Sequence, residues 1–230
     1  MTEQTKNFEK AAALFWALGG SIPHDSELET EAEKEVKEAG SREAVLRRAI
    51  RLCGGGNTPG ERYLLANLYS WLGASAARET VRWASAYLSG PAWERLPRGL
   101  VRQEGIQLSW ESSSRAAMLA ILAGAQAQLG ESGPALANYG EAARLEPYNA
   151  MYPVKTADLL AKTRSLEEAL AYLKNQRASA SYQPVKYRDQ QGNRLINDTF
   201  QQLLEAHIRK IESALQRRGV PADDPRGSNI

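Results

Sequence analysis

The sequence predicts an all-α protein built from antiparallel helical hairpins. Three observations support this fold class. Apolar residues recur at helical spacing in segments of about 12 to 15 residues. Glycine and proline separate these segments by very short turns, as expected where helices begin and end. Repeated runs with period two, which a sheet would require, are not found.

Residues 1–57 predict three helices that could cap one end of the fold. The first, Asn7–Leu18, places Phe8 and Phe15 on one face and ends at two glycines. The second, Ser26–Ala39, is acidic and has only a thin apolar stripe. The third follows a capping serine, Ser41, and ends before the glycines at 54–56.

Residues 58–177 predict successive helical hairpins. Thr58, Pro59 and Glu61 form a capping-box pattern with proline at the first helical position, and that helix should run to about residue 72. Further helices are expected over residues 75–88, 115–129, 132–145, 152–163 and 165–176. Prolines and glycines at 91–110 predict an irregular insertion there, with a short extended segment near Ile106.

The remaining residues predict a loop, a helix and a tail. Residues 178–194 are polar and rich in turn formers. Asp198–Arg217 carries an apolar stripe on one face, which suits a capping helix at the C-terminal end of a helical array. Residues 219–230 are expected to be disordered.

Two segments offset by 34 residues correspond to one another. Ala116, Ala123 and Ala135 in the first match alanines at 150, 157 and 169 in the second. A repeat of 34 residues with small residues at these points is typical of paired helices that pack closely. On these residues, together with Tyr139 and Pro147, the segment Ala116–Asn149 resembles the tetratricopeptide repeat family.

The resemblance is weaker on either side of that segment. Within the segment itself, Gln126 stands where the family has an aromatic residue. In the next repeat, Pro153 replaces the first large residue. A looser match begins near Pro59. The resemblance implies a right-handed superhelix of hairpins with a concave, ligand-binding face.

Carried onto this chain, the family's concave face implies a groove lined mainly by small and apolar side chains. Its predicted positions are Tyr63, Asn67, Ala117, Ala120, Gly124, Ala127, Met151, Val154 and Asp158. The basic set by which some relatives hold a peptide carboxylate is not reproduced. An apolar helix or an extended apolar peptide therefore fits better. The occupant is either a partner protein or, alternatively, the chain's own C-terminal helix or a second copy of the chain.

Composition restricts the other function classes. The formal net charge is +2, so no strong field favours nucleic acid or an anionic membrane. The single cysteine, Cys53, and two separated histidines do not have the spacing of metal ligands. No combination of acid, base and nucleophile is brought together by the sequence pattern. We therefore expect no catalytic residues, no cofactor and no enzymatic activity. No apolar run is long enough for a membrane span, and a cytoplasmic location is expected.

Two alternatives to a protein-binding scaffold remain open at this point. The basic segment Arg42–Arg51 carries four arginines that could contact phosphates, which would make the protein a nucleic-acid-associated regulator. The spacing of these arginines does not place all four on one helical face. The other alternative is a self-associating structural protein without a dedicated ligand.

Overall fold

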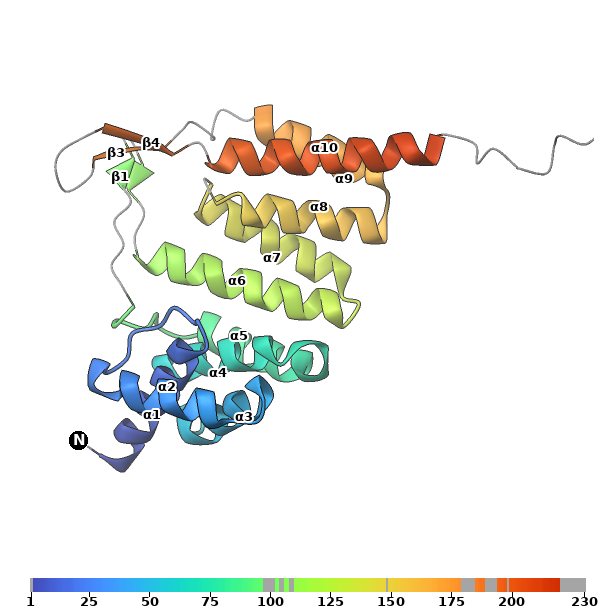
Figure 1. The fold of residues 1–230 in the computed structure, drawn as a ribbon. Coiled ribbons are helices and arrows are strands. Elements are labelled where there is room, and N and C mark those ends of the chain that lie inside the picture. The colour runs from blue at the N-terminus through green and yellow to red at the C-terminus, as the bar shows by residue number, and fades with distance from the viewer. Residues whose placement is uncertain are drawn as a thin grey trace, which may run out of the picture. The chain divides into compact units, whose positions relative to one another are not determined.

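The computed structural model describes residues 2–96, 102–103, 106–107, 110–147, 149–178, 185–188, 194–197 and 199–219. Ten α-helices dominate these residues, and successive helices pack as pairs (Figure 1). The predicted all-α class of helical hairpins is therefore confirmed. The chain divides into two compact units, Met1–Glu146 and Pro147–Ile230, which are described separately below.

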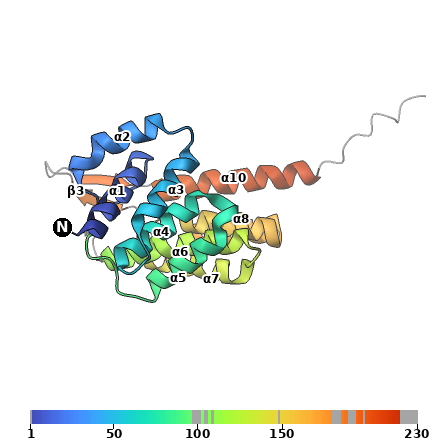
Figure 2. The ribbon, with the colours of Figure 1, turned by 90° about the horizontal axis from the view of Figure 1, so that it is seen from below.

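The first unit begins with three helices: α1 (Glu3–Ala17), α2 (Glu29–Glu38) and α3 (Arg42–Cys53). A short 3-10 turn, Ser26–Leu28, leads into α2. Helix α1 packs closely on α3 and also on α2, whereas α2 and α3 barely touch. Figure 2 shows α2 at the edge of this group, away from α4 and α5.

Two hairpins complete the first unit. Helix α4 (Pro59–Trp71) pairs with α5 (Ala77–Leu88), and α6 (Trp110–Gln128) pairs with α7 (Ser132–Leu145). Helix α5 packs on α6, and α4 also meets α6, so the first helices of the two hairpins are neighbours. Helix α6 begins five residues before the predicted start, inside the stretch expected to be irregular.

The start of α4 follows the capping-box prediction. The Glu61 amide donates to Thr58 Oγ1 at 3.2 Å, and the Glu61 carboxylate accepts in return from the Thr58 amide at 3.4 Å. Each bond satisfies one of the amide donors that a helix start leaves without a partner. At the other end of α4 a 3-10 turn, Gly73–Ala76, delays the start of α5 to Ala77, two residues later than predicted.

The core of the first unit includes an aromatic cluster around Trp93. Its ring lies 5.6 Å from Phe8 of α1 and 5.8 Å from Tyr63 of α4, and Tyr63 in turn contacts Tyr87 of α5. Gly60 is required here, because a Cβ at that position would lie 2.8 Å from the indole of Trp93. The first part of the predicted insertion is thus packed against α1 and α4. Residues 97–101, 104–105 and 108–109 of the insertion lie outside the described residues.

The second unit contains α8 (Met151–Thr163), α9 (Leu166–Ala178) and α10 (Thr199–Gly219). Helix α9 packs against both α8 and α10. The Ser165 hydroxyl accepts from the Glu168 amide at 3.0 Å and so caps α9 as predicted. The buried side of α10 carries Phe200, Leu204, Ile208 and Ile211. Residues 220–230, where a disordered tail was predicted, lie outside the described residues.

Two short antiparallel hairpins accompany the helices in the described residues. One contains the extended segment predicted near Ile106, and the other corrects a loop prediction. Strands β1 (Arg102–Gln103) and β2 (Ile106–Gln107) pair, as do β3 (Val185–Arg188) and β4 (Arg194–Asn197). The second pair lies where a loop was expected. A hairpin of this length needs only local pairing between two short runs, so it leaves no repeated period-two signal in the sequence.

Candidate functional site

The six alanines that define the 34-residue correspondence are all buried. Ala116, Ala123 and Ala135 lie inside the α6–α7 hairpin, and their counterparts at 150, 157 and 169 are buried in the second unit. Small side chains at these points let paired helices approach closely. Partly exposed positions of α6 next to these alanines are available to form a surface.

The predicted groove positions on α6 form one partly exposed strip. They are Ala117, Ala120, Gly124 and Ala127. A Cβ at Gly124 would lie 3.4 Å from the hydroxyl of Tyr139, so even the smallest side chain would be in contact there. At Gly124 the strip is bordered by the chain's own Tyr139, whereas Ala117, Ala120 and Ala127 are partly exposed and small enough to let another backbone or side chain lie close to the helix.

Helix α4 contributes less to this surface than predicted. The Tyr63 side chain is only 9% exposed, and burial raises its pKa to about 12. Tyr63 thus belongs to the core. Asn67 is partly exposed, and its Nδ2 donates to the Tyr63 carbonyl at 2.8 Å, which holds the amide against its own helix.

The predicted positions in the second unit differ from one another. Met151 is 47% exposed, whereas Val154 is buried. Asp158 accepts a hydrogen bond from His207 Nε2 of α10 at 3.0 Å. The chain's own C-terminal helix therefore contacts one of the predicted groove positions.

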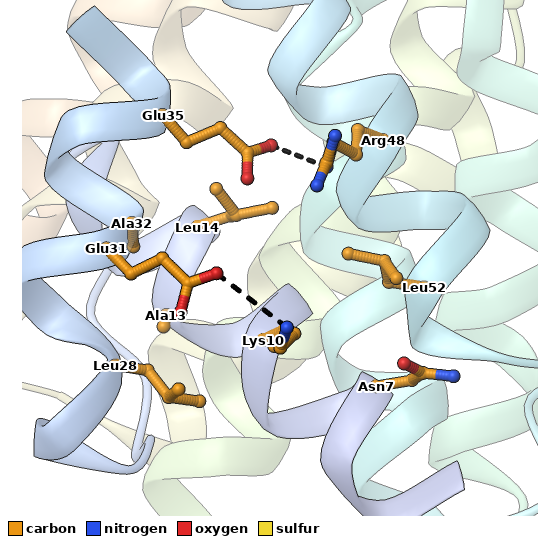
Figure 3. Close-up of a pocket in the computed structure, with 10 residues that line it drawn as sticks. All are labelled: Asn7, Lys10, Ala13, Leu14, Leu28, Glu31, Ala32, Glu35, Arg48 and Leu52. Atoms are coloured by element: carbon orange, nitrogen blue, oxygen red, sulfur yellow. Dashed lines mark ion pairs between the residues drawn. The ribbon is translucent and has the colours of Figure 1, made fainter. Parts of the chain in front are cut away.

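The sequence did not indicate a second hollow, which lies among the first three helices (Figure 3). It is a slot of about 100 Å³ with polar and apolar walls. Its lining residues are Asn7, Lys10, Ala13 and Leu14 of α1, Leu28, Glu31, Ala32 and Glu35 from the α2 segment, and Arg48 and Leu52 of α3.

Two ion pairs cross this slot. Lys10 Nζ lies 3.7 Å from Glu31 Oε1, and Arg48 Nε lies 2.5 Å from Glu35 Oε1. Figure 3 shows both carboxylates directed from α2 across the opening, with Leu14 between them. The members of these pairs are solvent-accessible to different degrees, from 26% for Glu35 to 64% for Glu31. Such pairs hold α2 only weakly.

Three of the four arginines of α3 are engaged within the chain, and the fourth, Arg51, is exposed. Arg42 lies over the Trp71 ring at 4.3 Å, Arg47 pairs with Glu43 at 2.8 Å, and Arg48 pairs with Glu35. A basic surface for nucleic acid would need these groups directed outwards together. This arrangement does not favour the nucleic-acid alternative.

The histidines and the cysteine have structural partners. His24 Nδ1 lies 2.9 Å from the Ile22 carbonyl and His24 Nε2 lies 3.0 Å from Glu29, beside the ring of Trp16. Burial strongly raises the pKa of the Cys53 thiol, which suppresses the reactive thiolate. Within the described residues, no group of three or more potential ligands is placed to bind a metal ion, and no helix has the length and hydropathy of a membrane span.

Comparisons with known proteins return little. No family model matches the chain, and no curated protein is significantly similar to it. Among solved structures, the crystal structure of MamA is similar, with a TM-score of 0.47 and 12% sequence identity, covering 86% of this chain and 98% of that chain.

Proposed function

We propose that this protein is a non-enzymatic scaffold that binds a protein or peptide through the strip Ala117–Ala127 of α6. The observation that carries the proposal is the row of four small, partly exposed positions on a helix whose opposite side is buried. Such a row lets a partner helix or extended peptide approach the backbone closely. No cofactor is part of this proposal.

A cytoplasmic location belongs to the same proposal. The single cysteine cannot form a disulfide within the chain, which suits a reducing compartment. The partner is either another protein or a second copy of this chain.

Substitutions on α6 test the proposal. Ala120→Arg and Ala127→Arg place a long charged side chain on the strip. Ala137→Arg makes the same change on the exposed side of α7 and serves as the matched control. Captured partners should be lost with both strip variants and kept with the control, while circular dichroism confirms that all variants fold.

The same variants distinguish binding of a second copy of this chain from binding of another protein. If the strip binds a second copy, light scattering should show a mass that rises with concentration and that the strip variants abolish. Capture that is equal for the wild type and both strip variants would refute the proposed surface.

A further inference from the structure

Helix α2 is the least anchored helix of the first unit. Its ten residues include five glutamates and two lysines, and only Ala32 is buried. Leu28, just before the helix, and Val36 within it are partly buried against the core. Because α2 rests on α1 and barely touches α3, an opening remains between α2 and α3 above α1, and this opening is the slot.

The floor of the slot is apolar. Ala13 and Leu14 of α1 form its base, and Leu28 and Leu52 stand at its two sides (Figure 3). The leucines at the sides are only partly buried, so their methyl groups are available for contact. A closed apolar cavity of about 150 Å³ holds one benzene molecule. A slot of about 100 Å³ is therefore suited to one aliphatic side chain.

The α2 side of the slot is acidic. Glu31 and Glu35 line it, and Glu38 continues the same helical face three residues further on. Their present partners, Lys10 and Arg48, are both about half exposed. Both cations and Glu31 are solvent-accessible, so these pairs are weak, and α2 carries five glutamates against two lysines. Cations from another molecule can therefore compete with Lys10 and Arg48 at small cost.

We propose that this slot binds a short basic segment of a partner protein. A single leucine, isoleucine or methionine of that segment enters between Leu28 and Leu52. Lysines or arginines on either side of it pair with Glu31 and Glu35. The site is separate from the strip on α6, so either can fail without the other.

Three labelled pentapeptides test the proposal against the full chain. Lys-Lys-Leu-Lys-Lys is the probe, Lys-Lys-Ala-Lys-Lys lacks the aliphatic side chain, and Glu-Glu-Leu-Glu-Glu reverses the charge. Fluorescence anisotropy should show saturable binding of the probe below about 1 mM. The alanine peptide should bind about tenfold more weakly, and the acidic peptide should not bind.

A pair of isoelectric variants locates the binding. Glu31→Gln with Glu35→Gln removes the acidic side of the slot. Glu33→Gln with Glu43→Gln removes the same charge from helical faces that do not line it. The first variant should weaken probe binding about fivefold or more relative to the second, and salt should weaken binding to the wild type.

The results separate the slot from non-specific attraction. Equal affinities for the leucine and alanine peptides would show that no side chain enters the slot. Equal affinities of the two double variants would show that its carboxylates are not used. Either result overturns the proposal, as does the absence of saturable probe binding.

Discussion

Replacing Glu61 should destabilise the first unit more than any other change at a helix start. The carboxylate is 3% exposed and accepts from the Asn57 amide at 2.7 Å, the Thr58 amide at 3.4 Å and Gln4 Nε2 at 2.9 Å. It therefore caps α4, holds the turn before it and ties α1 to both. Glu61→Ala removes all three bonds at once.

The cost can be worked from these contacts. Loss of a helix cap costs about 0.5–2 kcal/mol. A hydrogen bond to a charged group contributes about 1.5–3 kcal/mol, and a buried donor without a partner costs about 1–3 kcal/mol. Gln4 is exposed and regains water, so the bond to its side chain adds little. We expect about 3 kcal/mol for Glu61→Ala and about 1 kcal/mol for Thr58→Ala, which removes a single bond.

Tryptophan fluorescence during urea unfolding measures this loss selectively. The five tryptophans are Trp16, Trp71, Trp83, Trp93 and Trp110, all within Met1–Glu146. The signal therefore reports the first unit even if the second unfolds independently. The midpoint should shift while the urea dependence of the unfolding free energy stays constant, because the surface exposed on unfolding is unchanged.

The comparison with Thr58→Ala decides the outcome. If Glu61→Ala costs no more than Thr58→Ala, the carboxylate is not the shared acceptor of the junction. A double-mutant cycle with Gln4→Ala then isolates the link to α1, for which we expect a coupling of about 0.5–1 kcal/mol.

Three further experiments test other parts of the first unit. Gly56→Ala should lower the free energy of unfolding in urea by about 3 kcal/mol or more, because Gly56 has a φ of 73° and a Cβ there would lie 2.0 Å from Trp83. Gly55→Ala is the control, because a Cβ at that position would have no contact closer than 3.5 Å. Cys53 should react with a thiol reagent only after unfolding, since burial raises its pKa; rapid labelling of the native chain would contradict this burial. Burial also raises the pKa of Tyr63 from 10.0 to about 12, so the unfolded chain ionises first as the pH rises. The free energy of unfolding should therefore fall above pH 10.0, by up to about 3 kcal/mol. Tyr63→Phe should reduce that fall in urea midpoints measured against pH, and an unchanged fall would argue against the buried hydroxyl.

Features set by neighbours in sequence were predictable from the sequence. The cap at Thr58 and Glu61 depends on residues three positions apart, so the pattern contains the whole interaction. The buried alanines were found in the same way, because the spacing of 34 residues repeats the local pattern. The ends of helices were predicted less well where a 3-10 turn or an early helix start was decided by packing, as at Ala77 and Trp110.

Features set by distant contacts were not predictable. The family resemblance implied a groove position for Tyr63, but Trp93 packs against it from a stretch expected to be irregular. The slot needs Lys10 to meet Glu31 and Glu35 to meet Arg48, and these pairs join separate helices. The sequence shows the charges of α2 without showing which face of the helix borders an opening.

The two candidate surfaces require different partners because their side chains differ. The strip on α6 consists of alanines and glycine, which favour close approach but provide almost no side-chain area of their own. Binding there must draw its apolar area from large side chains of the partner. The slot on α1–α3 provides leucine methyl groups and carboxylates, so a short segment with one aliphatic and two basic residues suffices. A partner that uses both surfaces would gain from the second contact through effective concentration, without tight binding at either.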